Sequence, residues 1–159
     1  MTPLPDGVVI RLATRDEAET VAATVRRAFI TEAEIYGADV PPLHERAEDV
    51  LDTFDSGDVT LVAEADGRVV GTVRGETLAS GAVMVRRLGI DVEWRGRGIA
   101  RALMIALEAA YANAPRIELF TGSLSAAARA LYESLGYEYI RTETVAPGVE
   151  LLYLEKRRG

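Results

Sequence analysis

The chain has 159 residues, a length that suits one domain with a full hydrophobic core. Apolar residues make up 48% of it and charged residues 27%, the usual balance for a globular protein in water. The formal net charge of −7 argues against general nucleic-acid binding, because that function needs a basic surface. We therefore expect a single domain over residues 1–159, no nucleic-acid partner, and a charge that suits a cationic acceptor such as an amine.

Residue counts and the N-terminal segment exclude further classes of protein. There is no cysteine, which excludes disulfides and thiolate chemistry, and the one histidine, His44, argues against His-pair metal sites and a Ser-His-Asp triad. No basic segment followed by an apolar stretch opens the chain, and no apolar run approaches the roughly 20 residues of a membrane span. The sequence predicts a cytoplasmic protein with no metal and no membrane partner.

The first half of the chain predicts one strand, two helices and a hairpin. In order, these elements are a strand over Val8–Leu12, a helix with an apolar face from Ala18 to Phe29, a second helix with an apolar face from Leu43 to Phe54, and paired strands over Val59–Ala65 and Arg68–Thr77. A capping box, with Thr14 as N-cap and Glu17 reaching back, starts the first helix. Asp66-Gly67 is a two-residue hairpin signal between the paired strands.

The second half predicts a parallel strand pair and a final hairpin. In order, its elements are a strand over Gly81–Val92, a helix from Ile99 to Ala110 that ends before Pro115, a strand over Ile117–Thr121, a helix over Ala126–Leu135, and a hairpin of Tyr137–Val145 and Val149–Glu155. Because a helix links the strands at 81–92 and 117–121, these two should be parallel neighbours. The sequence predicts an α/β fold with a mixed, mostly antiparallel sheet of about seven strands and four helices on its two faces.

The sequence Arg95-Gly96-Arg97-Gly98-Ile99-Ala100 stands between a strand and a long amphipathic helix. Glycine lets the backbone approach an anion, the first N–H groups of a helix point at it, and arginine adds positive charge. Three interpretations compete. A dinucleotide loop of the G-x-G-x-x-G type lacks its third glycine, because Arg101 stands there. A plain turn leaves two glycines at a helix start without a reason. The third interpretation is a pyrophosphate loop for coenzyme A.

The third interpretation is supported by a resemblance to a known family. The six residues match the [Q/R]-x-x-G-x-[G/A] signature of the GNAT family of N-acetyltransferases, and Leu88–Val92 resembles that family's fourth strand. Ala128–Tyr137 is similar to its second signature, a helix with L-Y-E-x-L-G-[FY]. The resemblance spans roughly residues 8–157. It implies a GNAT-type acyl-CoA N-acyltransferase fold and direct transfer of the acetyl group of acetyl-CoA to a primary amine of a small molecule or peptide.

The resemblance also implies which residues hold acetyl-CoA. The backbone of Leu88, Gly89 and Ile90 would pair with the pantetheine arm, and an amide of this strand would polarise the thioester carbonyl. The pyrophosphate would take the N–H groups of Arg97 to Ala100, with the side chains of Arg95 and Arg97 nearby. Many relatives carry an asparagine for the pantetheine arm where this chain has Ser125. The serine would either bind the arm or cap the helix.

Tyr132 falls where the family often places its general acid, which would protonate the departing thiolate. Packing against apolar neighbours is the alternative from spacing alone. The general base is less defined, because the two positions where relatives carry a glutamate are Met84 and Phe120 here. Glu118 shares a strand face with Phe120 and is the first candidate. The alternatives are a water chain, Glu76, Glu143 and Glu150.

The acyl acceptor is expected over the first two helices and the final hairpin. Side chains there that suit such a site are Tyr36, Asp39, His44, Glu45 and Tyr153. Two other classes of protein stay open: a non-catalytic acyl-CoA-binding or regulatory domain of the same fold, and a nicotinamide oxidoreductase, which the missing third glycine disfavours. Relatives often form dimers, so a homodimer is left open, and the sequence does not identify the acceptor.

Overall fold

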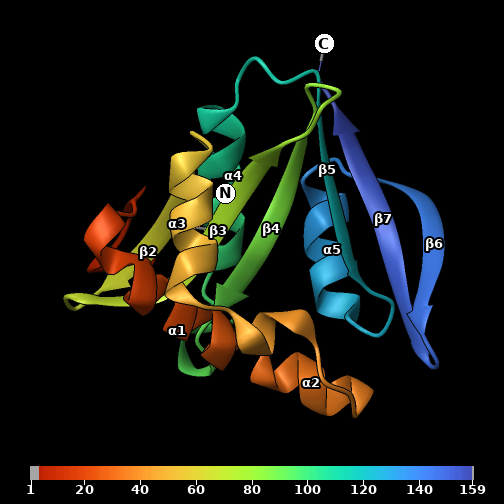
Figure 1. Ribbon diagram of the computed structural model, residues 1–159, viewed down its shortest axis with the longest axis horizontal. Helices are drawn as coiled ribbons and strands as arrows, with labels where there is room; N and C mark the ends of the chain where they lie inside the picture. The colour runs from red at the N-terminus through yellow and green to blue at the C-terminus, as the bar shows by residue number, and fades with distance from the viewer. Residues whose placement is uncertain (1–3, 159) are drawn as a thin grey trace.

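In the computed structural model, which describes residues 4–158, seven strands form one mixed sheet (Figure 1). The strands are β1 (Val8–Leu12), β2 (Thr60–Ala65), β3 (Arg68–Thr77), β4 (Val83–Ile90), β5 (Arg116–Gly122), β6 (Glu138–Ala146) and β7 (Val149–Arg157). Their order across the sheet is β1-β2-β3-β4-β5-β7-β6. Of the strand pairs in this described range, only β4 and β5 run parallel, which confirms the parallel neighbours predicted from the linking helix.

Helices cover both faces of the sheet. They are α1 (Ala18–Ala28), α2 (Ile30–Tyr36), α3 (Ala47–Asp55), α4 (Ile99–Ala110) and α5 (Ala126–Ser134). Strand β2 shows how the faces divide, because Val62 packs with α1 and α3 whereas its neighbours Leu61 and Ala63 pack in the core that contains α4 and Tyr132 of α5. Alternation along a strand thus supplies the two hydrophobic layers that hold the helices.

Local signals in the sequence account for the first helix and the hairpin. The Glu17 carboxylate accepts the N–H of Thr14 at 2.9 Å, which completes the predicted capping box before α1. Asp66 and Gly67 have φ angles of +52° and +77° between β2 and β3. Two consecutive positive φ angles are those of the type I′ turn that matches the twist of paired strands.

Three features differ from the sequence-based expectation. The helix expected from Leu43 begins at Ala47, because Pro41–His44 forms a separate 3₁₀ turn. The short helix α2 was not expected, and it contains no buried residue, so it lacks the apolar spacing by which helices are recognised. The strand expected to reach Val92 ends at Ile90, and Val92–Trp94 forms a 3₁₀ turn. The turn is closed by hydrogen bonds from the N–H of Trp94 to the carbonyl of Asp91 at 2.9 Å and from the N–H of Arg95 to that of Val92 at 3.3 Å.

Strands β4 and β5 separate soon after they meet, which opens the sheet. Their register covers only Val83 with Ile117 and Met84 with Glu118. Further along β4 a bulge follows, because Arg74 pairs with Arg86 and Thr72 with Gly89, so that two residues of β4 oppose one of β3. Arg87, in this bulge, has a φ angle of +56°, a conformation rarely adopted outside glycine and asparagine. The bulge and the separation place cavities on either side of β4.

Candidate active site

A cavity of about 530 Å³ lies where β4 ends and α4 begins, bounded by α2 and α5. Most residues that the resemblance assigns to acetyl-CoA line it: Leu88, Gly89, Ile90, Arg95, Gly96, Gly98, Ile99, Ala100, Ser125 and Tyr132. These residues come from three separate segments of the chain. The structure therefore brings the strand, the glycine turn and the α5 helix to one cavity.

The start of α4 forms one wall of this cavity. Gly98 is the N-cap with a φ angle of +84°, and glycine takes this left-handed conformation without the steric penalty of a Cβ atom. The first hydrogen bond within the helix runs from the N–H of Ala102 to the carbonyl of Gly98 at 3.1 Å. The N–H groups of Ile99 and Ala100 thus have no acceptor inside the helix, and they lie at the cavity. An anion such as a diphosphate suits this wall.

The two arginines of the glycine turn have different surroundings from those expected. Arg95 donates to the carbonyl of Ile90 at 3.0 Å, the carbonyl of Ala28 at 2.7 Å and the hydroxyl of Thr31 at 3.2 Å. Because three acceptors hold its guanidinium, Arg95 fastens the end of β4 to α1 and α2 and shapes the cavity. Arg97 is exposed and stacks 4.7 Å from the ring centre of Trp94. It does not line the cavity.

Tyr132 lies buried at the cavity, beside a carboxylate that the sequence did not single out. Burial, and then the charge of Glu32, raise the pKa of Tyr132 well above its ordinary value. Burial also raises the pKa of Glu32, which reaches the cavity from α2. The ring of Tyr137 packs edge-on at 6.2 Å from that of Tyr132. The tyrosine therefore keeps its proton at neutral pH. Glu32 was missed because nothing in its periodicity revealed α2.

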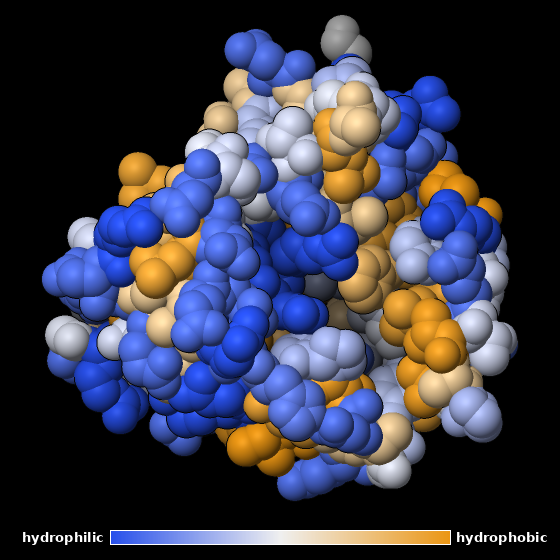
Figure 2. Space-filling view, in the orientation of Figure 1, coloured by the Kyte–Doolittle hydropathy of each residue, from blue (hydrophilic) through white to orange (hydrophobic). Residues whose placement is uncertain are grey.

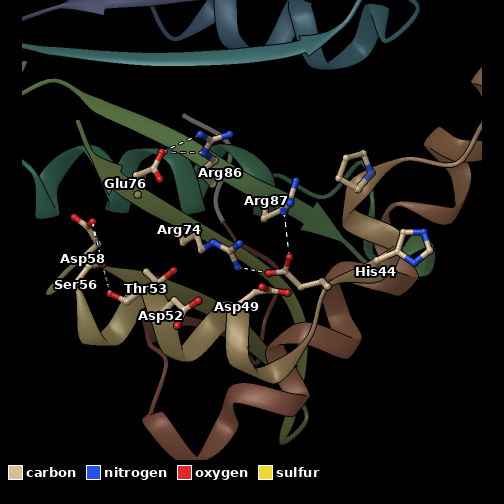
Figure 3. A pocket seen from close by; sticks show the side chains of 13 residues that line it. His44, Asp49, Asp52, Thr53, Ser56, Asp58, Arg74, Glu76, Arg86 and Arg87 are labelled. Atoms are coloured by element: carbon tan, nitrogen blue, oxygen red, sulfur yellow. Dashed lines mark hydrogen bonds and ion pairs between the residues drawn. The ribbon is translucent and has the colours of Figure 1, made fainter. Parts of the chain in front are cut away.

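A second cavity of about 420 Å³ lies on the other side of β4, between β3, β4 and α3 (Figure 3). Arginine side chains from the strands, Arg74, Arg86 and Arg87, point into it. In Figure 2 the molecule is hollowed at the centre of this face, with hydrophilic side chains on the α3 side and more hydrophobic ones along β5. Arg87 lines this cavity while its neighbour Leu88 lines the first one. The linings of the two cavities therefore come from adjacent residues at the bulge of β4, a point that we call the junction.

Glu118, the first candidate for the general base, lies away from this junction. It pairs with Met84, four residues before Leu88, which is about 13 Å along a strand. Its carboxylate binds the Arg116 guanidinium at 2.6 Å, and Arg116 also lies 3.6 Å from Glu155. The structure thus brings Glu118 into a surface ion-pair group and into neither cavity. Alternation along β5 gave its face correctly but not its distance from the reacting centre.

The other candidates for the general base lie in different parts of the structure. Glu76 lines the second cavity and pairs with Arg86 at 2.8 Å. Glu143 pairs with Arg141 at 3.0 Å, and Glu150 is exposed on β7. Of the side chains suggested for the acceptor, two line the second cavity, and the remainder do not. Those two are His44, which also pairs with Asp39 at 2.7 Å, and Glu45.

Tyr36 and Tyr153 have structural partners. The Tyr36 hydroxyl accepts the N–H of Leu124 at 2.9 Å. The Tyr153 ring lies 5.5 Å from that of Phe120 and 4.1 Å below the Arg141 guanidinium. Among residues 4–158 no group of three or more histidine, cysteine, aspartate or glutamate side chains is placed to hold a metal ion. Within the same range, no helix has the length and apolar character that crossing a membrane requires.

A mixed sheet that splits between its two parallel strands, with a bulged strand and a helix N-terminus at one cavity, defines the acyl-CoA N-acyltransferase fold class. The family model described as "Acetyltransferase (GNAT) domain" matches residues 56–139. The chain therefore belongs to the GNAT acetyltransferase family. This confirms the resemblance drawn from the two motifs.

Similar proteins agree with the family assignment. The N-acetylaspartate synthetase of Xenopus tropicalis is 38% identical over 106 residues, which are 63% of this chain and 39% of that protein. The chain thus spans about two fifths of the length of this relative. An N-acetyltransferase of Staphylococcus aureus Mu50 has a TM-score of 0.79 at 17% identity, covering 94% of this chain and 98% of that one. The protein yncA of Salmonella typhimurium, described with its cofactor acetyl-CoA, has a TM-score of 0.78 at 18% identity, covering 96% and 94%. The two structures share the fold.

Proposed function

We propose that this chain transfers the acetyl group of acetyl-CoA to the primary amine of a small molecule or a peptide. The observation that carries the proposal is this junction at the bulge of β4, where Leu88 lines one cavity and its neighbour Arg87 lines the other. A thioester approaching from one side and an amine from the other would meet there without passing each other. Direct transfer needs this arrangement and no covalent enzyme intermediate.

The residues around the first cavity suit a coenzyme A thioester. The N–H groups at the start of α4 would bind the diphosphate, and Gly96 and Gly98 would let it approach closely. A side chain at position 89 would have no room beside α1, because a Cβ atom on Gly89 would lie 2.7 Å from the Cβ atom of Ala28. The backbone of β4 near Leu88 and Ile90 would pair with the pantetheine arm, and Ser125 would lie along it.

The chemistry follows from the groups at the junction. The neutral amine attacks the thioester carbonyl carbon, a C–N bond forms, and the carbonyl oxygen becomes negatively charged. A backbone N–H of the β4 bulge would stabilise that charge. When the intermediate collapses, the C–S bond breaks, the sulfur takes a proton from the acid, and the nitrogen loses one proton to become the amide, a proton that restores the acid. Tyr132 would be that acid, because the phenol lies at this cavity and its raised pKa means that it holds its proton at neutral pH.

Transfer also requires that the ammonium lose a proton before attack. Glu118 lies too far along the sheet to take it directly. Glu76 lines the second cavity with a partly exposed side chain, and water bound there would provide a path to solvent. We propose this water path in place of Glu118.

The name of the relative suggests a finer acceptor. An N-acetylaspartate synthetase matches 63% of this chain, which supports an amino acid as the acceptor of this protein too. Aspartate is the first compound to test. A non-catalytic acyl-CoA-binding domain is the second candidate, favoured by the position of Glu118 outside both cavities.

The test combines binding and turnover. Titration calorimetry with acetyl-CoA and with CoA measures binding at the first cavity, and release of free CoA with a panel of amines, followed by mass spectrometry of the products, measures transfer. Binding together with an acetylated amine supports the proposal. Binding without any acetylated product across the panel would favour the non-catalytic domain, and no binding would exclude both.

A further inference from the structure

The floor of the second cavity holds a buried cluster of charges. The Glu45 side chain is 2% exposed, and its carboxylate pairs with Arg74 and, at 3.2 Å, with Arg87. The backbone carbonyl of Glu45 accepts a hydrogen bond from the Arg26 guanidinium at 2.6 Å. The Arg74 and Arg87 side chains are 12% and 23% exposed. Two largely buried guanidinium groups thus share one carboxylate.

Other charged groups lie beside this cluster. Asp49 lines the same cavity, accepts the N–H of Arg46 at 2.9 Å and lies 3.6 Å from the Arg46 guanidinium. Arg26 is already paired with Glu19 at 2.7 Å. Arg87 and Arg74 each give one hydrogen bond to Glu45, although a guanidinium carries five N–H donors. The two guanidinium groups therefore keep free donors beside the cavity.

Arg87 is also placed at the reacting centre. It occupies the bulge of β4 with a φ angle of +56°, directly before Leu88 of the first cavity. A backbone conformation that disfavours most side chains costs stability and needs a compensating role. Here the conformation turns an arginine into the second cavity at the point where the amine must arrive.

We infer that Arg74 and Arg87, positioned by Glu45, form the site that binds the carboxylate of the acyl acceptor. The acceptor is then an α-amino acid or another small primary amine with a carboxylate close to the nitrogen, because one end must bind Arg87 while the other reaches the adjacent bulge. Guanidinium groups recognise carboxylates through paired hydrogen bonds. This inference rests on the proposed transfer to an amine and names its substrate class.

The distribution of charge around the cavity suits a zwitterionic acceptor. Asp52 and Asp58 give the rim beside α3 negative charge, whereas Glu76 is paired with Arg86 (Figure 3). A molecule with both an ammonium and a carboxylate matches that division of charge. A plain polyamine would place a cation against Arg74 and Arg87, and electrostatic repulsion disfavours it there.

The experiment compares acids with their amides. CoA release is measured for L-aspartate, L-alanine and their α-amides, with wild type and Arg87→Asn. Asparagine tolerates a positive φ angle, so the bulge is kept while the guanidinium is removed. We expect the wild type to prefer the acids, and Arg87→Asn to raise KM for them about 10- to 100-fold with a smaller change for the amides. KM for acetyl-CoA should stay the same.

Arg46→Asn is the matched control, because it removes the same charge one residue from Glu45. The Arg46 side chain is 66% exposed and lines neither cavity, and asparagine suits its N-cap position. We expect KM for the amino acids to change less than threefold. Equal KM increases in both variants would overturn the inference in favour of a general charge effect.

A binding measurement separates failure of this inference from failure of the proposed function. Melting temperatures of the CoA-saturated wild type are recorded with each acid and each amide, which requires no turnover and no variant. Stabilisation by the acids alone supports the carboxylate site even if no amine is acetylated. The inference is overturned if acids and amides are acetylated equally well, or if they raise the melting temperature equally. Either result leaves the proposed acetyl transfer intact.

Discussion

The Tyr36 hydroxyl accepts a hydrogen bond from the backbone N–H of Leu124, 88 residues further along the chain, at 2.9 Å. The same hydroxyl lies over Gly122, where a Cβ atom would be only 2.0 Å from it. This contact fastens the end of α2 to the loop that leads to Ser125 and α5. Both helices line the cavity assigned to acetyl-CoA, so one tyrosine joins two of its walls.

Tyr36→Phe should weaken this closure, the contact between α2 and the loop before α5, without unfolding the protein. Loss of one hydrogen bond corresponds to about 0.5–1.5 kcal/mol, so KM for acetyl-CoA should rise about two- to tenfold. Gly122→Ala should raise it further, because the added methyl group displaces the ring. Tyr139→Phe is the matched control, since it removes an exposed hydroxyl that bonds to Thr142 on β6. A larger rise in KM with Tyr139→Phe than with Tyr36→Phe would contradict the closure.

Tyr132→Phe should slow turnover by roughly 10²- to 10⁴-fold, as expected for loss of a general acid. Because burial raises the pKa of Tyr132, the phenol stays protonated through neutral and mildly alkaline pH, and turnover should not fall there through its ionisation. Tyr137→Phe is the control. It removes the hydroxyl that donates to Glu108 at 2.8 Å, a contact that supports the fold. We expect that control to lower the melting temperature and leave the turnover rate within a fewfold of wild type.

Glu32→Gln should make stability less dependent on pH. Burial raises the folded-state pKa of Glu32, so the folded protein holds this proton more tightly than the unfolded chain. Its stabilising contribution is present below the ordinary glutamate pKa and is lost as pH rises through the raised value. The variant should therefore unfold at a higher temperature than wild type at pH 7, and the difference should shrink toward pH 4. Thermal unfolding of the free protein at both pH values measures this, and a difference that grows at low pH would refute it.

Gly98→Ala should weaken binding of acetyl-CoA and of CoA. A left-handed conformation costs an alanine about 1–2 kcal/mol, and relief of that strain would move the first N–H groups of α4. Gly57→Ala is a matched control, because Gly57 has a similar φ angle of +81°, has open space around its Cα and lies after α3, away from this cavity. Both variants should lose comparable stability. Only Gly98→Ala should raise the dissociation constant in calorimetry, and an equal effect of both would argue against a diphosphate at this turn.

Glu118→Gln should leave turnover nearly unchanged. The carboxylate is held by Arg116 at 2.6 Å in a partly exposed pair, whose loss costs roughly 0.2–1 kcal/mol. We expect a turnover rate within about threefold of wild type and the same rise of rate with pH as the amine loses its proton. A hundredfold or larger loss of turnover, with a changed pH profile, would restore Glu118 as the general base.

Local patterns made much of the site predictable. Asp66-Gly67 specified a hairpin, and the two glycines before Ile99 specified an anion site at a helix start, because these residues encode backbone conformations within a few positions. The two family motifs then placed Tyr132 and the glycine turn at one ligand. The cavity lined by both supports that expectation.

Side-chain partners could not be predicted in the same way. Arg95 was expected near the pyrophosphate, and it lines that cavity, but its bonds to the carbonyl groups of Ala28 and Ile90 were not predicted. Glu118 was assigned the correct face of β5 but not its position relative to the bulge. Glu32 was overlooked because α2 buries none of its residues and therefore shows no apolar periodicity.

The sequence by itself determined the order of the strands and of the longer helices, the hairpin turns and the glycine start of α4, since each depends on backbone preferences of neighbouring residues. Only the tertiary structure decided the bulge at Arg87, the pairing of Glu45 with two arginines and the contact of Tyr36 with Leu124. The physical reason is distance along the chain. Hydrogen bonds and ion pairs between residues dozens of positions apart depend on how the whole sheet packs, and no local pattern records that packing.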